Sequence, residues 1–118
     1  MPVLQTSVRT SQIADGRYAV AIAGELDLDV APTVRSRLGE LVDGGATTIV
    51  VDLLEVSFID SAGLSVFIAA RKALADAGGE LILVVDNPNL TKLLAITGVG
   101  RGTRVEKSLL EAVSRAVA

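Results

Sequence analysis

The chain has 118 residues, half of them apolar, and 14 acidic residues outweigh 11 basic residues to give a net charge of −3. The length suits one domain with a single core, residues 1–118, and the absence of Cys and His excludes disulfides, thiol chemistry and zinc sites with the usual ligands. The acidic balance and the scarcity of aromatic side chains argue against a nucleic-acid groove, which needs basic patches and stacking surfaces.

The first predicted elements are two strands joined by a turn. Residues 3–9 and 17–23 have the pattern of strands, and Asp15-Gly16 is predicted to turn the chain between them. Gly24 is expected to end the second strand, so that residues 25–27 form a loop.

The first predicted helix follows this loop. Asp29 is expected to be its N-cap, and Pro32 falls in its first turn, where the missing N–H costs little. Apolar residues then recur at helical spacing as far as Gly44-Gly45, where the helix is expected to end.

Two strongly apolar segments, residues 48–53 and 80–85, are predicted to be strands covered on both faces. Residues 54–59 are expected to form a connecting loop, and a helix is predicted from about Ser61 to Ala77, with Gly78-Gly79 as its stop. The residues expected in the core are Ile49, Val51, Leu53, Leu81, Leu83 and Phe67.

The C-terminal third contains two further predicted helices. One begins at Asn87-Pro88, an N-cap followed by proline at the first helical position, and ends at Gly98. Residues 103–106 are predicted to be a short strand, and Ser108 is predicted to cap a terminal helix. Residues 98–102 are rich in glycine but follow a helix and lack a Gly-Lys-Ser/Thr ending, so they do not predict a phosphate loop.

Strands that alternate with helices predict an α/β fold: one domain with a mixed, mostly parallel central sheet of four to five strands and about four helices. Right-handed crossovers bring the ends of parallel strands to one edge, which should unite residues 24–29, 52–61 and 86–87. The carboxylates expected there are Glu25, Asp27, Asp29, Asp52, Glu55, Asp60 and Asp86. Such an edge favours a partner protein with a basic face, and Asp27 and Ser61 are expected to share its footprint.

Ser61 is the most informative residue of this edge. The polar stripe of its helix is predicted to be exposed and to comprise Ser61, Ser65, Lys72 and Asp76. The opposite stripe is predicted to be buried and to comprise Gly63, Phe67, Ala70, Leu74 and Ala77. Ser61 should therefore face solvent at a helix N-terminus, where backbone N–H groups and the helix dipole can accept a phosphate. From the residues alone, a simple helix cap by Asp60 or Ser61 is the plainer interpretation.

The stretch F-I-D-S-A-G-L, residues 58–64, resembles the phosphorylation-site motif of the anti-sigma-factor antagonists, a family of STAS domains whose first motif serine is the phosphoacceptor. Further stretches resemble other motifs of that family, in the same order: G-E-L-D at 24–27, G-G-E-L at 78–81 and T-G-V at 97–99. The resemblance covers almost the whole chain. Ala62 departs from the Ser or Thr that the family often has, which removes a second hydroxyl and keeps the acceptor, Ser61.

The resemblance implies a STAS-type fold and a switch between partners. The unphosphorylated domain would bind an anti-sigma factor, itself a serine kinase of the histidine-kinase-like ATPase type, and so release a sigma factor. Phosphorylation of Ser61 would end that binding, and a phosphoserine phosphatase would restore it. The other residues expected to contact the partner are Asp60, Gly63, Asp27, Glu25 and Ser65. Gly63 is expected to contribute by having no side chain to block the partner.

The expected protein is not an enzyme and has no cofactor, no metal, and no direct contact with nucleic acid or membrane. No apolar run reaches the roughly 18 residues of a membrane span, and residues 1–4 lack a signal-peptide pattern, so a cytoplasmic location is expected. Asp60 could serve as a helix cap alone, and Asp27 could serve as a turn residue alone, so both alternatives to partner contact stay open.

Two other functions compete with the phosphorylation switch. One is a structural or interaction subunit of another complex, such as a transporter or a signalling assembly. The other is a small nucleotide-binding or phosphate-handling enzyme of flavodoxin-like shape. The second is disfavoured because no Gly-rich loop follows the first strand, and because Ser61 has no His to serve as a triad base.

Overall fold

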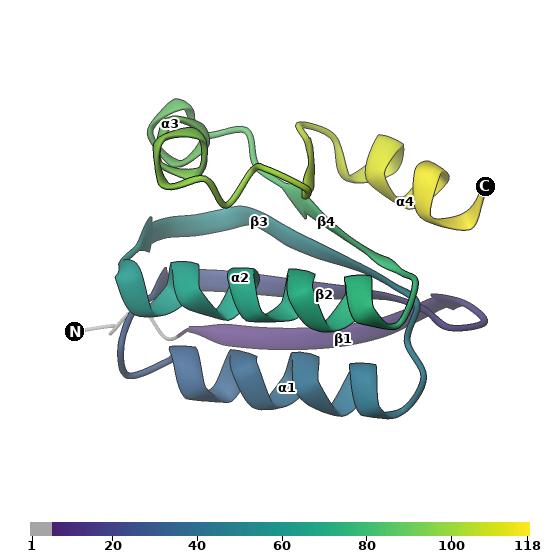
Figure 1. The fold of residues 1–118 in the computed structure, drawn as a ribbon. Helices are drawn as coiled ribbons and strands as arrows, with labels where there is room; N and C mark the ends of the chain where they lie inside the picture. Colours follow the sequence, from purple (N-terminus) through teal and green to yellow (C-terminus); the bar gives the residue numbers. More distant parts are fainter. Residues whose placement is uncertain (1–5) are drawn as a thin grey trace.

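A computed structural model describes residues 6–118 and contains one five-stranded sheet (Figure 1). The strands are β1 (Ser7–Ala14), β2 (Arg17–Leu26), β3 (Thr48–Ile59), β4 (Glu80–Val84) and β5 (Arg104–Glu106). The helices are α1 (Ala31–Asp43), α2 (Ser61–Asp76), α3 (Pro88–Thr97) and α4 (Leu109–Val117). The sheet order is the chain order, with β1 antiparallel to β2 and the other pairs parallel. The predicted mixed α/β fold is confirmed.

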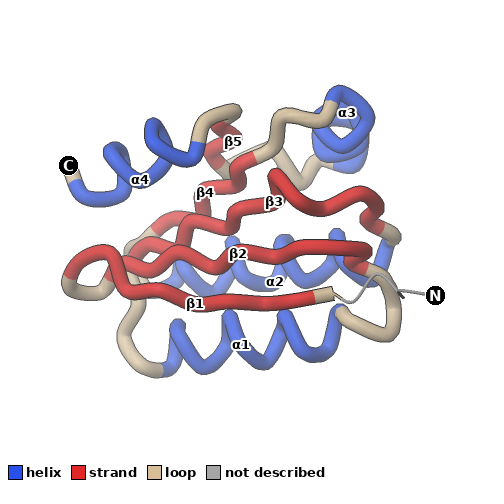
Figure 2. Tube along the Cα trace, turned by 180° about the vertical axis from the view of Figure 1, so that it is seen from behind, coloured by secondary structure: helices blue, strands red, loops and turns tan. Residues whose placement is uncertain are grey.

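The sheet separates two apolar layers. Right-handed crossovers between successive parallel strands put their helices on one face, and α1 and α2 lie together in front of the sheet in Figure 1 and behind it in Figure 2. The larger cluster lies on this face and includes every core residue that the sequence predicted. α4 covers the opposite face, where Ala112 and Ala116 pack on Val50, Ile82 and Val84.

The first hairpin turns at Asp15-Gly16 as predicted, but both of its strands have other bounds than predicted. β1 begins at Ser7 and continues to Ala14, whereas the prediction placed it at residues 3–9, of which 3–5 lie outside the described residues. β1 is an edge strand whose side chains are mostly exposed, so it carries no alternating apolar signal. β2 passes through Gly24 and ends only at Leu26, because β3 continues beside it.

β3 shows the largest difference from the prediction. Residues 54–59, expected to be a loop, continue the strand and pair with β2 up to the partners Leu26 and Ile59. The register shifts between Asp52 and Glu55 and again between Val56 and Phe58, which marks two bulges. β4 stops at Val84, opposite Asp52, so β3 extends well past its other neighbour.

Local hydrogen bonds explain where the helices begin. Asn87 and Ser108 cap α3 and α4 as predicted, each accepting a backbone N–H with its side-chain oxygen. For α1, the predicted place of Pro32 and the end at Gly44 are confirmed, but the predicted cap is wrong: the N-cap is Val30, and the carboxylate of Asp27 rather than Asp29 accepts the N–H groups there. α2 begins at Ser61 as predicted but ends at Asp76, which leaves Ala77 exposed rather than buried.

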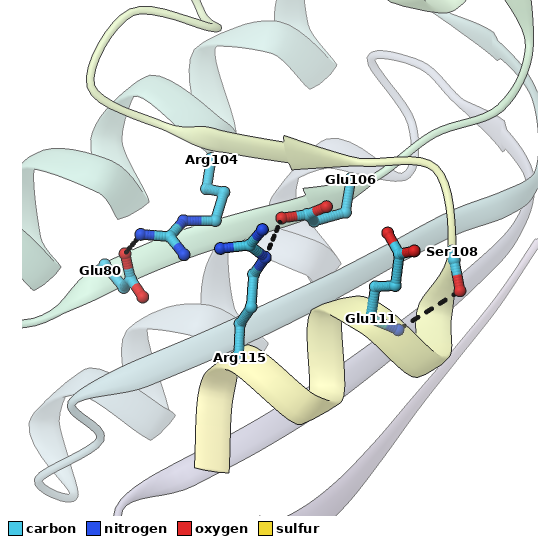
Figure 3. A network of polar contacts seen from close by, with 6 residues as sticks. All are labelled: Glu80, Arg104, Glu106, Ser108, Glu111 and Arg115. Atoms are coloured by element: carbon cyan, nitrogen blue, oxygen red, sulfur yellow. Dashed lines mark hydrogen bonds and ion pairs between the residues drawn. The ribbon is translucent and has the colours of Figure 1, made fainter. Parts of the chain in front are cut away.

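Two ion pairs fasten the last strand and the last helix to the sheet (Figure 3). Arg104 of β5 lies 3.6 Å from Glu80 of β4, between Nη2 and Oε2. Arg115 of α4 lies 2.8 Å from Glu106 of β5, between Nε and Oε1. The two pairs link β5 to β4 and to α4, and both lie on the face of the sheet that α4 covers (Figure 3).

Candidate functional site

The site lies where β2 and β3 end together. Leu26 and Ile59 are the last register partners of the two strands, and the Asp60 N–H donates to the Leu26 carbonyl at 3.2 Å. The loop from β2 to α1 and the junction from β3 to α2 therefore touch. This confirms the prediction that Asp27 and Ser61 lie at one edge of the sheet.

Asp60 ties the two segments together through both oxygens of its carboxylate. Oδ1 accepts the Gly63 N–H at 3.1 Å and caps α2, while Oδ2 accepts the Leu28 N–H at 3.1 Å. The extended backbone of Asp60 suits an N-cap. The cap prediction is confirmed, and Asp60 also fixes the neighbouring loop, which sequence reasoning did not foresee.

Ser61 is the first residue of α2 and its side chain is exposed. The rest of the predicted polar stripe, Ser65, Lys72 and Asp76, is exposed as well. One turn after Ser61, the Ser65 hydroxyl donates to the Ala62 carbonyl at 2.7 Å and accepts from Arg35 Nη2 at 3.2 Å. The stripe is therefore open to a visiting molecule at its N-terminal end.

Gly63 is needed inside the domain rather than at its surface. A Cβ built there would lie 2.6 Å from the Leu26 carbonyl oxygen, 2.8 Å from Leu26 Cγ and 3.0 Å from Ile59 Cγ2. Gly63 is buried, and its missing side chain lets α2 approach β2 closely. The expectation that this gap admits a partner is wrong, because the chain's own strands fill it.

Asp27 and Glu25 occupy different positions at the edge. The Oδ1 of Asp27 accepts from the N–H groups of Asp29 and Val30 at 3.1 and 3.2 Å, which shapes the entry to α1. Glu25 lies within β2 opposite Phe58, and its side chain is exposed. Asp27 therefore shapes the turn before α1. Contact of Asp27 or Glu25 with a partner stays a prediction.

The expected rim of seven carboxylates is wrong in its extent. Asp52 and Glu55 lie within β3, and Asp86 follows β4, which stops opposite Asp52. At about 3.3 Å per strand residue, the end of β4 is roughly 20 Å short of the end of β3. The acidic group in the loop beside Ser61 is therefore smaller and comprises Asp27, Asp29 and Asp60.

Two exposed apolar side chains at this edge were missed. Leu28 is 71% exposed although Asp60 holds its backbone in place, and Phe58 is 47% exposed near the end of β3. Single exposed apolar side chains are common on protein surfaces, so it is their position at this end of the sheet that makes Leu28 and Phe58 candidates for contact with a partner. The available signal was Leu28 itself, a single apolar residue between two aspartates of a predicted loop.

The described residues lack two other kinds of feature. Across residues 6–118, no group of three or more acidic side chains is arranged to hold a metal ion. Over the same range, none of the helices has the length and apolar character needed to cross a membrane.

Comparison with known proteins gives three findings. The family model described as STAS domain matches residues 9–112. An anti-sigma-B factor antagonist of Staphylococcus aureus is 35% identical over 98 residues, covering 78% of this chain and 91% of the relative. An anti-sigma-B factor antagonist of Listeria monocytogenes is 38% identical over 80 residues, covering 68% and 70%.

Solved structures show the same fold at lower identity. An anti-sigma factor antagonist from Mycobacterium paratuberculosis superposes with a TM-score of 0.85 at 24% identity, covering 97% of this chain and 96% of that one. The anti-sigma factor antagonist SpoIIAA in its unphosphorylated form gives 0.78 at 20% identity, covering 94% and 97%. The phosphorylated form of SpoIIAA, a Bacillus cell fate determinant, gives 0.76 at 23% identity, covering 92% and 98%.

Proposed function

Since this chain belongs to the STAS domain family, we propose that it is an anti-sigma-factor antagonist whose binding is switched off by phosphorylation of Ser61. The observation that carries the proposal is the exposed Ser61 hydroxyl at the first position of α2. Asp60 supplies the cap, so the serine is not needed for that purpose. The similar proteins of Staphylococcus aureus and Listeria monocytogenes are both named anti-sigma-B factor antagonist, which supports the proposal.

The surface around Ser61 has the make-up of a protein interface. Leu28 offers exposed apolar area beside Asp60, and Asp27 and Asp29 flank it with negative charge, whereas Glu25 and Phe58 are register partners that point to the opposite face of the sheet from α2. Such a surface suits a partner with an apolar depression and a basic rim. The proposed partner is an anti-sigma factor that is a serine kinase of the histidine-kinase-like ATPase type.

Phosphorylation would act on this surface through charge. A phosphoserine adds about −1.5 to −2 charges at neutral pH. At Ser61 that charge would stand beside Asp60, and it would have to lose its water where the partner meets this helix start with its apolar depression rather than its basic rim, which is costly. Release of the partner therefore needs no change of fold. A phosphoserine phosphatase would reverse the step, and this chain itself needs no catalytic residue.

The test is a calorimetric titration of the partner kinase with wild type, Ser61→Ala and Ser61→Glu. Ser61→Ala should bind as wild type does and should resist loss of binding after incubation with ATP. Ser61→Glu should bind at least tenfold more weakly, which corresponds to a loss of about 1.4 kcal/mol in binding free energy. Thermal melts of all three proteins should show that each is folded.

Ser65→Ala is the matched control, because Ser65 is the other exposed serine of the same stripe. It should be phosphorylated at Ser61 as wild type is, as mapped by mass spectrometry. Equal affinity of the partner for wild type, Ser61→Ala and Ser61→Glu would contradict the switch and leave a structural STAS subunit as the function.

A further inference from the structure

Arg35 reaches from α1 to the exposed face of α2. Its Nη2 donates to the Ser65 hydroxyl oxygen at 3.2 Å, and both side chains are exposed. Ser65 lies four residues after Ser61, and helix residues four apart have Cβ atoms about 5–6 Å apart. The guanidinium of Arg35 therefore lies one helical turn from the Ser61 hydroxyl, which is the phosphorylation site under the proposed function.

The geometry of the two helices favours a move of Arg35 toward Ser61. Both α1 and α2 begin at the same edge of the sheet and lie side by side (Figures 1 and 2). Arg35 and Ser65 are each the fifth residue of their helix. Long side chains on a helix lean toward its N-terminus, which is the direction of Ser61.

The exchange of contacts is favourable in energy. At present Arg35 donates to a neutral hydroxyl that is already bonded to a carbonyl. In the present bond only the donor carries a charge, whereas in a contact with an ionised phosphate both partners carry opposite charges. The planar guanidinium can also bind two phosphoryl oxygens at once, which a lysine cannot.

Other cations near this face are badly placed for the same task. Lys72 follows Ser61 by eleven positions, which is about 16 Å along a helix at 1.5 Å per residue. Arg71 donates to the carbonyls of the loop after α3. Arg37 donates to Thr10 of β1, at 3.2 Å from Nη1.

We propose that Arg35 receives the phosphoryl group of phosphorylated Ser61, exchanging its contact with Ser65 for an ion pair with the phosphoryl oxygens. The inference rests on the proposed function for the modification itself. Its consequence is that phosphorylation changes two groups together. It places a dianion at the edge and withdraws the guanidinium of Arg35 from any partner that would bind there.

The test is a double-mutant cycle in which phosphoserine is built into position 61 during translation, so that no kinase is needed. Thermal unfolding is measured with serine and with phosphoserine at 61, in wild type, Arg35→Gln and Arg37→Gln. The Tm of the phosphoserine form minus the Tm of the serine form should be about 3–5 °C higher in wild type than in Arg35→Gln. Arg37→Gln, the same substitution on the same helix, should match wild type.

An NMR measurement tests the contact directly. The Nε–H signal of Arg35 should shift when the phosphate is present and return when a phosphatase removes it, while the signal of Arg37 should stay in place. Equal effects of phosphate on Tm in wild type and Arg35→Gln, with an unmoved Arg35 signal, would overturn the inference.

Partner titration of the same proteins separates the two proposals. If phosphoserine at 61 abolishes partner binding but shows no coupling to Arg35, the switch stands and the Arg35 inference fails. If coupling is present but the partner binds both forms equally, the phosphate contact stands and the proposed function fails.

Discussion

The substitution Gly63→Ala should have two opposite effects on stability: a gain from helix propensity and a loss from steric overlap with β2. Alanine has a higher helix propensity than glycine by about 1 kcal/mol, so the change should stabilise α2 if the space around Gly63 were open. The structure instead places a new Cβ 2.6 Å from the Leu26 carbonyl oxygen and 3.0 Å or less from two side-chain carbons. The nearest obstacle is backbone of β2 and cannot rotate away.

The steric effect should win. Overpacking of a filled core costs about 1–3 kcal/mol, and a backbone obstacle places this site near the upper end of that range. Subtracting the gain in propensity leaves a loss of about 2 kcal/mol in the free energy of unfolding. For a chain of this size, that corresponds to a fall in Tm of about 6–10 °C.

Urea unfolding followed by circular dichroism measures the change, and Gly39→Ala is the control. Gly39 lies within α1, and a Cβ built there would meet no atom within 4 Å apart from the adjoining backbone of its own helix. Gly39→Ala should therefore gain about 0.5–1 kcal/mol from propensity alone. A neutral or stabilising Gly63→Ala, beside a stabilising Gly39→Ala, would refute the close approach of α2 to β2.

Two further predictions use the same measurement. Asp27→Ala should lose about 0.5–2 kcal/mol because it removes the acceptor of the Asp29 N–H and leaves the Val30 N–H with the Asp27 backbone carbonyl alone. Asp29→Ala should stay within about 0.5 kcal/mol. The reverse order would restore Asp29 as the cap. Gly79→Ala should lose at least about 3 kcal/mol, since its Cβ would overlap the Thr47 carbonyl oxygen that also accepts the Glu80 N–H. A Gly79→Ala protein as stable as Gly63→Ala would contradict that packing.

Sequence reasoning succeeded where one local signal decided the outcome. The buried strands at 48–53 and 80–85 are nearly all apolar, and Asn87-Pro88 combines a cap with a proline at N1. It failed at residues 54–59, where the buried side chains Leu53, Val56 and Ile59 are spaced by three. Each bulge inserts one residue into the strand, so the alternation that identifies a strand is absent.

The site was predicted in part for a similar reason. The motif around Ser61 and the shared edge with Asp27 follow from sequence and topology, and both residues lie where expected. The choice between Asp27 and Asp29 as the cap of α1 depends on the path of the loop, because both are good caps two residues apart. The contact of Arg35 with Ser65 depends on how two helices pack, which no local pattern reports.

The order of the sheet has a consequence for how the chain assembles. Every strand pairs with the strand before it along the chain, so no strand has to enter between two that are already joined. The hairpin of β1 and β2 can form first, and each later helix and strand then extends the free edge of what precedes it. Ordered growth of this kind keeps loop closures short, which favours fast folding. The sheet can therefore be built from one end to the other in the order in which a ribosome delivers the chain.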